Sequence, residues 1–513
     1  MEHLFIEIMN LCFEYKWMIA AAILIIHFMP TGTDAEKEVT TNFKPDNAHG
    51  AARFVVENKL LKVLFGTKGV HIGYSPDGKR KLFYPGAGHL FLCAAARTGK
   101  GATLLVNALL EWKHSVVVFD PKAELSSITG HYRRKLGTVY VLNPLNIQMN
   151  ALNGLKQACF NPMAILDPLS ISFHALCAKI AAVLVTDEEG KGKHFSDAAR
   201  DLLHGIIAAL VRHEDASKRN LVEVARIVSS GDGLFRFCRD AMQSGDPYII
   251  QKLQRFAVTP TSKDPVSDEI RDVVATATTN LGFITGGIAE SLKGSDFRFA
   301  DLKRKPGTSV YICLPLSTLD VSDKYFRLLL DCFLTDLLEE GQRGKGKPVL
   351  AIVDEMAQIG PHMKSLENAM GMAAGAAGLQ LWCVLQDLSQ LKGMFPHTWE
   401  TFIQNCGVTM WFGARDDTTR KYISALAGTT EVLSRGRNAS ENPATGEIVI
   451  NESATQMGRP LVLPEEAGTK VASDQMIMFV EGVNNPIKAK RKFYFACPEY
   501  RGKYRDNPYF KKR

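Results

Sequence analysis

The chain has 513 residues, of which 46% are hydrophobic and 22% are charged. This composition is close to that of folded globular proteins and excludes a disordered or collagen-like chain. The length exceeds that of one ordinary domain, so two or three folded units are expected. The ten cysteines are scattered singly, without Cys-x-x-Cys pairs or zinc-ligand spacing. This pattern argues against a disulfide framework and a zinc site, and it favours a reducing compartment such as the cytosol.

The net charge of +7 is concentrated at the C-terminal end. Residues 488–513 contain ten lysines and arginines against Glu499 and Asp506, so the rest of the chain is close to neutral. A basic end of this kind can contact the phosphates of DNA or of lipids. The part from Ile487 to Phe495 alternates basic and apolar residues, which is typical of an edge strand with one wet face. We expect an edge strand there and leave a DNA or lipid contact open for the tail beyond it.

An apolar segment near the N-terminus is expected to anchor the chain in a membrane. Trp17 to Met29 is an uncharged run of thirteen residues, which is shorter than the roughly 20 residues that span a bilayer. A longer stretch that includes Glu14 and Lys16 reaches this length, and both side chains lie near its end, where they can extend to the interface. A cleaved signal peptide and a buried or interfacial helix are the alternatives. We expect a retained membrane helix within residues 1–30.

Strand and helix patterns alternate along the chain from Leu90 onward, which predicts an α/β fold with a parallel sheet and crossover helices. The expected strands are Leu90–Cys93, Ser115–Phe119, Thr138–Leu142, Ser309–Leu314, Val349–Val353, Leu379–Leu385 and Val408–Phe412. Between the third and fourth strands the periodicity is helical, as in "ARDLLHGIIAALVRH" from Ala199, so an all-helical insert is expected. The stretch from Arg435 to Arg459 is polar and contains glycine, and we predict a loop there.

The segment from Leu90 to Trp112, "LFLCAAARTGKGATLLVNALLEW", nearly matches the phosphate-binding loop G-x-x-x-x-G-K-[ST]. A strand, a glycine-containing turn, a lysine and a helix follow one another, so backbone N–H groups and the positive helix end can face an anion. Ala94 replaces the first glycine and Gly101 replaces the hydroxyl residue. A helix start that contains Gly-Lys by chance is the alternative. The candidate nucleotide-binding residues are Arg97, Thr98, Gly99, Lys100, Gly101 and Ala102.

Polar side chains at the ends of two further strands complete the predicted site. Asp354 and Glu355 follow the strand Val349–Val353. Asp354 is suited to bind Mg²⁺ directly or through water, and Glu355 is suited to polarise the attacking water. Gln386 follows the strand that ends at Leu385 and is suited to sense a γ-phosphate. Simple capping by the same side chains is the alternative for each position.

In this order, the motifs resemble those of the coupling proteins of type IV secretion and conjugation, a branch of the RecA-like hexameric DNA motors. The resemblance runs from about His49 to the C-terminus. It rests on "HGAARF" from His49, "TGKGATLLVNALLEWKHSVVVFDPKAEL", "HFSDAARDLLHGII" from His194, "DEMAQIG", "VLQDLSQL" and "FIQNCGVTMWFGARD". Members of the family commonly carry Gly-Lys-Gly, so Gly101 fits the family, whereas Ala94 departs from it. If position 94 needs a left-handed backbone, alanine costs about 1–2 kcal/mol there.

The resemblance implies a RecA-like P-loop NTPase core with a parallel-rich sheet, an all-α insert domain and an N-terminal membrane helix. The implied division is an anchor over 1–30, a first nucleotide-binding part over 31–165, the all-α domain over 166–300 and a second nucleotide-binding part over 301–513. A homohexameric ring is also implied, in which an arginine of the neighbouring subunit completes each site.

Arg415 is the candidate for that arginine, and a surface ion pair with Asp416 or Asp417 is the alternative. Three further residues, Asp120, Lys122 and Glu124, follow a predicted strand close to the phosphate loop. We expect them to surround the Mg²⁺ ion without binding it directly.

The implied function is a transfer reaction that depends on ATP and Mg²⁺ and delivers single-stranded, relaxase-bound DNA to a type IV secretion channel and its accessory proteins. The implied location is the bacterial inner membrane, with the catalytic body on the cytoplasmic side. Two alternatives stay open: the same motor moving protein effectors, and a docking platform that binds nucleotide without hydrolysing it. The sequence offers no cargo-specific residue.

Overall fold

The computed structural model describes residues 48–510 apart from the segments 56–57, 186–191, 260–265, 316–318, 344–345, 361–362, 372–376, 442–447, 470 and 472. The chain divides into two compact units, one of Met1–Arg53 with Ala427–Leu461 and one of Phe54–Leu426 with Val462–Arg513. The helical insert and the sheet thus share one unit. The expected membrane helix within residues 1–30 lies outside the described residues. Among the helices that are described, none has the length and apolar character needed to span a bilayer.

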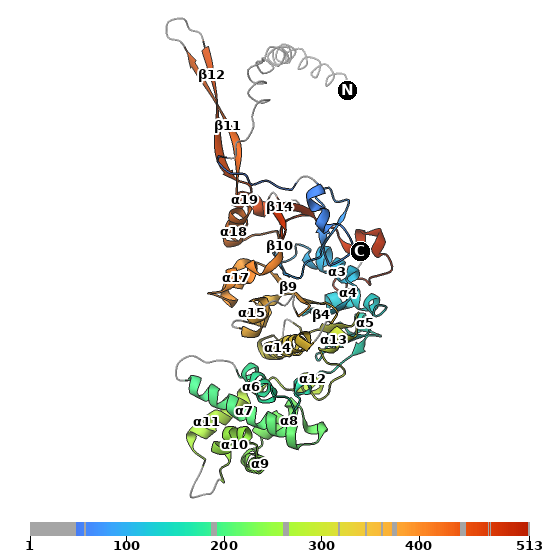
Figure 1. Ribbon diagram of the computed structural model, residues 1–513, viewed down its shortest axis with the longest axis vertical. Coiled ribbons are helices and arrows are strands. Elements are labelled where there is room, and N and C mark those ends of the chain that lie inside the picture. The colour runs from blue at the N-terminus through green and yellow to red at the C-terminus, as the bar shows by residue number, and fades with distance from the viewer. Residues whose placement is uncertain are drawn as a thin grey trace, which may run out of the picture. The chain divides into compact units, whose positions relative to one another are not determined.

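The second unit is built on a twelve-stranded sheet (Figure 1) with the order β2-β1-β14-β13-β10-β3-β9-β8-β4-β7-β5-β6. Its strands are β1 Val70–Tyr74, β2 Lys81–Tyr84, β3 His89–Ala94, β4 Ser115–Phe119, β5 Val139–Leu142, β6 Lys156–Gln157, β7 Ser309–Ile312, β8 Val349–Val353, β9 Leu379–Leu385, β10 Cys406–Phe412, β13 Gln475–Val480 and β14 Val483–Lys490. Neighbouring strands pair in parallel from β10 to β6. The predicted α/β fold with a parallel-rich sheet is confirmed.

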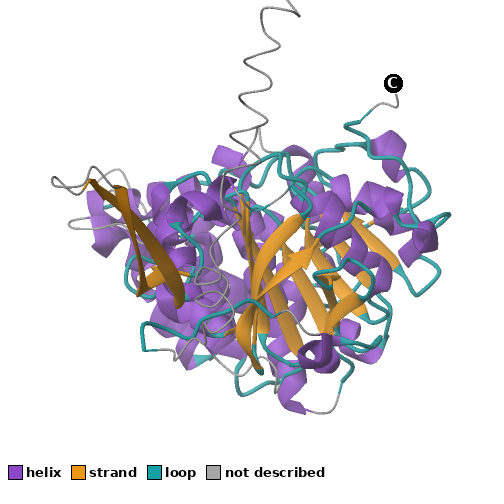
Figure 2. Ribbon diagram, turned by 90° about the horizontal axis from the view of Figure 1, so that it is seen from above, coloured by secondary structure: helices purple, strands orange, loops and turns teal. Residues whose placement is uncertain are grey.

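Helices lie on both sides of this sheet (Figure 2), so its central strands are buried on both faces. Every residue of β4 and of β8 is buried, and both read as continuous apolar runs, as strands covered on two faces do. The helices of this region are η1 Asn58–Leu64, η2 Gly101–Leu105, α3 Val106–Glu111, α4 Glu124–Arg133, α5 Met149–Leu152, α13 Asp301–Arg304, α14 Leu319–Arg343, η8 Met356–Ile359, α15 Lys364–Gly371, α16 Leu388–Met394, α17 Trp399–Gln404, α18 Asp417–Ala427, α19 Pro464–Thr469, η9 Tyr494–Ala496 and η10 Pro498–Tyr500.

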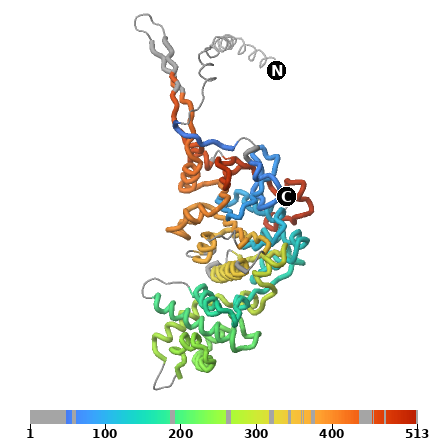
Figure 3. Tube along the Cα trace, in the orientation of Figure 1, coloured from blue at the N-terminus to red at the C-terminus, as the bar shows by residue number. Residues whose placement is uncertain are grey.

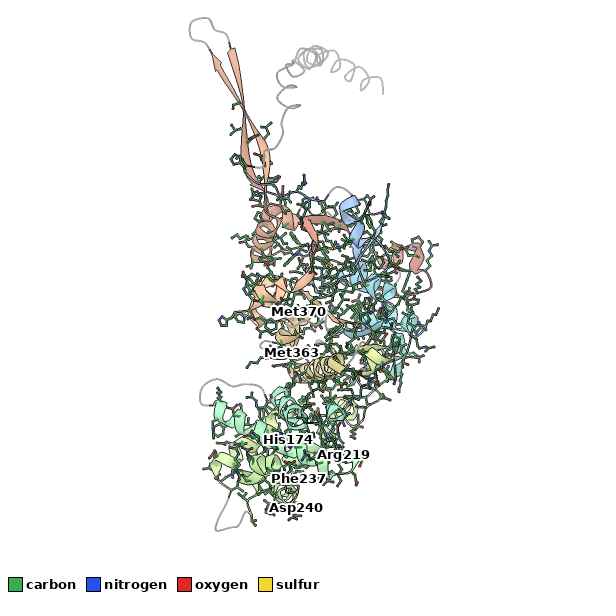
Figure 4. The ribbon with its side chains drawn as sticks, viewed as in Figure 1. His174, Arg219, Phe237, Asp240, Met363 and Met370 are labelled. Atoms are coloured by element: carbon green, nitrogen blue, oxygen red, sulfur yellow. The ribbon has the colours of Figure 1, made fainter. Side chains whose placement is uncertain are left out.

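Between β6 and β7, the described residues contain helices and no strand, in agreement with the helical periodicity. They are η3 Pro162–Ile165, α6 Phe173–Leu184, α7 Lys193–His213, η5 Ala216–Lys218, α8 Leu221–Val228, α9 Asp232–Met242, α10 Pro247–Leu253, η6 Gln254–Phe256, α11 Asp268–Leu281 and α12 Gly286–Ser291, followed by α13. Asn220 and Asp246 cap α8 and α10 by accepting backbone N–H groups. His174, labelled in Figure 4, lies in α6 and contacts His204 of α7, with 3.3 Å between Nδ1 and Nε2.

The first unit contains a two-stranded antiparallel hairpin, and the prediction of a loop over 435–459 is therefore wrong. Its strands are β11 Thr429–Glu441 and β12 Ile448–Pro460, paired from Thr429 with Pro460 to Glu441 with Ile448. A two-stranded ribbon has two exposed faces, so its sequence needs no alternation of apolar and polar residues. The exposed side chains of Ser434, Ser453 and Met457 illustrate this. The polar composition that indicated a loop is compatible with a ribbon.

The expected edge strand over Ile487–Phe495 is misplaced in the prediction. β14 ends at Lys490 and pairs with β13 on one side and with β1 on the other, so it is an inner strand. In Figure 3 the C-terminal part of the chain accordingly runs beside the N-terminal strands. Ile487 and Ala489 are fully buried. The predicted alternation of basic and apolar residues is present in β14. Its lysines, Lys488 and Lys490, are only partly exposed because the strand has a neighbour on each side.

Arg133, at the end of α4, is fully buried and joins three elements around the sheet. Its Nη1 donates to the carbonyl oxygens of Leu109 (3.0 Å) and Trp112 (2.8 Å), and its Nη2 to that of His114 (2.6 Å). Its Nε donates to Ser309 Oγ at 2.6 Å. The carbonyl oxygens at the end of α3 have no N–H donors within the helix, and the Arg133 guanidinium provides the missing donors.

We expect Arg133→Leu to lower the free energy of unfolding by about 3 kcal/mol or more, because several buried acceptors lose a charged donor. Arg134→Leu is the matched control, since the exposed Arg134 makes one hydrogen bond, to Gly154 O at 2.6 Å. The control should change stability by less than about 1 kcal/mol. Urea unfolding followed by circular dichroism measures both; equal losses would contradict the role of Arg133.

Candidate nucleotide-binding site

The carboxyl ends of the central parallel strands meet at one edge of the sheet. Register pairs Ala94 with Phe412 between β3 and β10, Cys93 with Leu385 between β3 and β9, and Phe119 with Val353 between β4 and β8. The residues that follow these strand ends therefore lie close together, as at the ligand-binding edge of parallel α/β sheets. They are the loop 95–100, Asp120, Asp354 with Glu355, and Gln386.

The loop after β3 turns sharply into the π-helical turn η2. Arg97 and Gly99 have positive φ values of 63° and 83°. Thr98 Oγ1 donates to Ala95 O at 2.6 Å, and Thr103 Oγ1 donates to Gly99 O at 2.8 Å. The first N–H groups of a helix have no acceptor inside it, so the loop and the start of η2 provide donors for an anion.

Ala94 does not strain this loop, because position 94 does not need the left-handed backbone that would make alanine costly there. It is the last residue of β3 and is only 1% exposed, with its φ outside the positive range. Arg97 is the non-glycine residue of the loop that has a left-handed backbone. The conformational cost that the sequence suggested for Ala94 therefore falls on Arg97.

Glu355 is the centre of a polar cluster assembled from the ends of four strands, β3, β4, β8 and β9. Lys100 Nζ lies 3.1 Å and Lys122 Nζ 3.5 Å from its Oε1. Gln386 Nε2 donates to its Oε2 at 2.8 Å. Burial acts to raise the pKa of Glu355, but the positive charge of Lys100 and the hydrogen bond from Gln386 outweigh it and lower the pKa. Four residues predicted from sequence are thus brought together.

Two buried polar atoms of the site make no hydrogen bond with the described residues. One is Lys100 Nζ, which is at ion-pair distance from Glu355 without hydrogen-bond geometry, and the other is Asp354 Oδ1. Burial raises the pKa of Asp354 to about 7. Buried groups of this kind normally have partners. An ammonium and a carboxylate oxygen left open at the same edge of the sheet fit a phosphate and a divalent cation.

Asp120 and Glu124 have structural partners at this edge. Asp120 accepts hydrogen bonds from the backbone N–H and the hydroxyl of Ser126, both at 2.7 Å, and from Glu124 N at 3.0 Å. Burial raises its pKa to about 6. Glu124 Oε1 accepts from Asn507 Nδ2 at 2.6 Å. Asp120 thus holds the start of α4 in place, and Lys122 of the same loop reaches Glu355.

Arg415 lies just beyond the end of β10 with an exposed side chain. The ion pair weighed as its alternative role is not found: Asp417 pairs with Lys421 at 2.7 Å, and Asp416 accepts from Thr419 N at 2.8 Å. Within the described ranges, Arg415 makes no ion pair.

Sequence reasoning missed Arg491, which supports the phosphate loop from the far end of the chain. Its Nη1 donates to Thr98 O and to Thr103 Oγ1, both at 3.1 Å, and its guanidinium lies 3.6 Å from the ring centre of Phe412. It is 6% exposed, and burial lowers its pKa to about 10. The sequence did hold one indication that Arg491 is buried. It follows the apolar Ala489 by two residues, and in a strand residues two apart point to the same face.

The first part of the basic tail, residues 492–500, packs against the protein through buried side chains. Tyr494, Cys497 and Tyr500 are at most 4% exposed. Lys81 Nζ lies 3.0 Å from Glu499 Oε1. Truncation of this tail would therefore remove core residues together with its positive charges.

A separate cleft of about 780 Å³ opens at the opposite edge of the sheet, where β3 and β10 begin. His89, Cys406 and Glu481 contribute to its lining. Glu481 accepts a hydrogen bond from the Tyr84 hydroxyl at 2.6 Å. The described lining has neither lysine nor arginine, so this cleft lacks the charges that the Glu355 cluster offers to a phosphate.

A family model described as "Type IV secretory system Conjugative DNA transfer" matches residues 44–512. The chain belongs to this family. It is 27% identical over 423 residues to Protein VirD4 of Rhizobium radiobacter, a match that covers 80% of this chain and 57% of that protein. It is 25% identical over 474 residues to Conjugal transfer protein TraG of Escherichia coli, covering 85% of this chain and 72% of that protein. The predicted resemblance to coupling proteins is confirmed.

Solved structures of the conjugative coupling protein TrwB have the same fold. An unbound form, TrwBdeltaN70, aligns with a TM-score of 0.62 and 16% identity, covering 86% of this chain and 92% of that one. TrwB in complex with ADP and Mg²⁺ aligns with a TM-score of 0.61 and 16% identity, covering 86% of this chain and 94% of that one. The coupling-protein fold thus extends over most of the chain.

We expect Arg97→Gly to raise the free energy of unfolding by about 1 kcal/mol, because glycine adopts the left-handed backbone without steric cost. Ala94→Gly should instead lower the free energy of unfolding by about 0.5–1 kcal/mol. Glycine relieves no strain in this strand and has more conformational freedom than alanine in the unfolded chain. Urea unfolding without nucleotide gives both values. A stabilising Ala94→Gly with a neutral Arg97→Gly would show that the strain lies at position 94 after all.

Proposed function

We propose that the chain is an ATP-driven coupling protein that recruits relaxase-bound single-stranded DNA and moves it to a type IV secretion channel and its accessory proteins. The observation that carries the proposal is the cluster of Lys100, Gln386 and Lys122 around Glu355, beside the open Asp354 carboxylate. A phosphate-binding lysine, an acidic pair and a glutamine at one sheet edge are the groups that nucleoside triphosphate hydrolysis needs.

The residues present fit ATP and Mg²⁺. Lys100 and the N–H groups from Thr98 to Ala102 would contact the phosphates, and Asp354 would hold Mg²⁺ directly or through water, since Gly101 offers no hydroxyl. Bound Mg²⁺ would neutralise charge on the phosphate oxygens. TrwB has been solved with ADP and Mg²⁺ and with the non-hydrolysable ATP analogue ADPNP, which supports the same ligands for this fold.

Glu355 is the group that would accept a proton from the attacking water. The positive charge of Lys100 lowers the pKa of Glu355, which makes this carboxylate a weak base. When Lys100 turns to the phosphates, that effect is lost and the pKa of Glu355 rises. Gln386 keeps its hydrogen bond to Oε2 and so holds the carboxylate in position. The Lys100–Glu355 ion pair therefore keeps the base inactive until a triphosphate arrives.

The proposal includes a homohexameric ring at the bacterial inner membrane, anchored through residues 1–30 and with its catalytic body in the cytoplasm. The exposed Arg415, without an ion pair among the described residues, would complete the site of the neighbouring subunit. Support for DNA as cargo comes from the family description and from a relative named for conjugal transfer. The chain spans 57% of the VirD4 protein that it matches, so each of these activities is proposed for the chain itself.

We expect Lys100→Ala to weaken Mg·ATP binding by about 10- to 150-fold, because a charged contact to phosphate is worth about 1.5–3 kcal/mol. Glu355→Gln should keep ATP affinity within about threefold and lower kcat by about 100-fold or more, because it removes only the general base. Lys113→Ala, an exposed lysine after α3, is the control. Calorimetry and phosphate release measure the two effects, and unchanged ATP affinity in Lys100→Ala would refute the site.

Hydrolysis by the full chain with and without a single-stranded oligonucleotide separates the three functions. An increase in the rate of ATP hydrolysis when DNA is added supports the DNA motor, because hydrolysis would then depend on the bound cargo. Turnover that DNA does not change would favour protein effectors as cargo. Binding of ATP without turnover would identify a docking platform.

A further inference from the structure

The C-terminal segment, defined here as residues 491–509, runs along the proposed nucleotide site. Arg491 donates to Thr98 O, and Asn107 Nδ2 donates to Lys492 O at 2.9 Å. Farther along, Asn507 bonds to Glu124, and the Tyr509 hydroxyl donates to Lys122 O at 2.7 Å. The segment is therefore attached to the phosphate loop at one end and to the loop after β4 at the other.

Two phenylalanines of this segment form an exposed stack beside the phosphate loop. The rings of Phe493 and Phe495 lie 5.0 Å apart at 18°, and the residues are 46% and 56% exposed. A Cβ placed on Gly99 would lie 3.5 Å from Phe493 Cε1. Neighbouring rings of the same segment, Tyr494 and Tyr500, are buried in the core. The segment thus buries alternate rings and presents the Phe493–Phe495 stack at the loop.

We propose that Phe493, backed by Phe495, is the platform on which the base of the bound nucleotide stacks. The inference deepens the proposed function and rests on it. The polar cluster around Glu355 accounts for the phosphates and the cation but offers nothing to the flat apolar face of a purine. An aromatic pair already stacked next to Gly99 provides that face, since a base adds to the stack as a third ring.

Stacking depends on the face of the base and is tolerant of its edge groups. Phe493 should therefore contribute equally to the binding of ATP and GTP. Inorganic tripolyphosphate, which has the phosphates without a base, should not depend on Phe493. This difference separates a base platform from a ring that only holds the phosphate loop in shape.

The test is calorimetric binding of Mg·ATP, Mg·GTP and Mg·tripolyphosphate to the full chain. Phe493→Ala should weaken both nucleotides by about 5- to 150-fold, the range of base–aromatic stacking, and leave tripolyphosphate unchanged. Phe510→Ala is the matched control, because Phe510 is 74% exposed and directly follows the C-terminal segment. It should change none of the three affinities.

Phe493→Trp keeps the proposal testable if the alanine variant folds poorly. It should retain nucleotide affinity, and ATP but not tripolyphosphate should quench its added fluorescence relative to the wild type. Equal loss of ATP and tripolyphosphate in Phe493→Ala, or no loss of either, would overturn the platform. A wild-type chain that binds neither probe would refute the proposed function itself, and with it this inference.

Discussion

The parallel register of β3, β9, β8 and β4 determines where the candidate catalytic groups lie. Cys93 is level with Leu385 and Val353 with Phe119, so the chain leaves these four parallel strands at the same edge of the sheet, with β3 and β9 extending about two residues beyond β8 and β4. A shift by one residue would exchange the side chains of the two buried faces and disturb the close packing on each, so the register is fixed by the core. The positions of Lys100, Glu355 and Gln386 follow from that packing, with no need for the loops to be ordered by a ligand.

The antiparallel strands on the other side of β10 add a second constraint, which couples the C-terminal end to the phosphate loop. β13 and β14 return the chain so that Arg491 leaves the sheet next to Thr98. A buried guanidinium is tolerated only when its donors are satisfied. The acceptors of Arg491 are the carbonyl oxygens of Thr98, Ser473 and Gln475 and the Thr103 hydroxyl. Movement of the loop and movement of the C-terminal segment are therefore coupled, which relates the nucleotide site to the basic end of the chain.

Sequence predicted the features that depend on local pattern and missed those that depend on distant partners. The strands β3, β4, β5, β7, β8, β9 and β10 were found because buried parallel strands read as apolar runs, whereas the short, exposed β6 has no such run. The hairpin β11–β12 was missed because a ribbon without a covered face needs no alternation. Sequence could raise backbone strain at Ala94 only as a possibility, from the glycine that the motif has there, whereas the left-handed residue is Arg97. Arg491 and Phe493 contact residues nearly four hundred positions earlier, a relation that no local pattern carries.

The structure brings the Lys100–Glu355 ion pair, the unpartnered Asp354 carboxylate oxygen and the C-terminal segment together at one edge of the sheet. Amide hydrogen exchange of the full chain, with and without Mg·ATP, tests this arrangement most directly, because ligand binding slows local opening. The account predicts slower exchange in residues 97–105 and, together with it, in residues 491–496. Unchanged exchange in 97–105 at saturating Mg·ATP would contradict it.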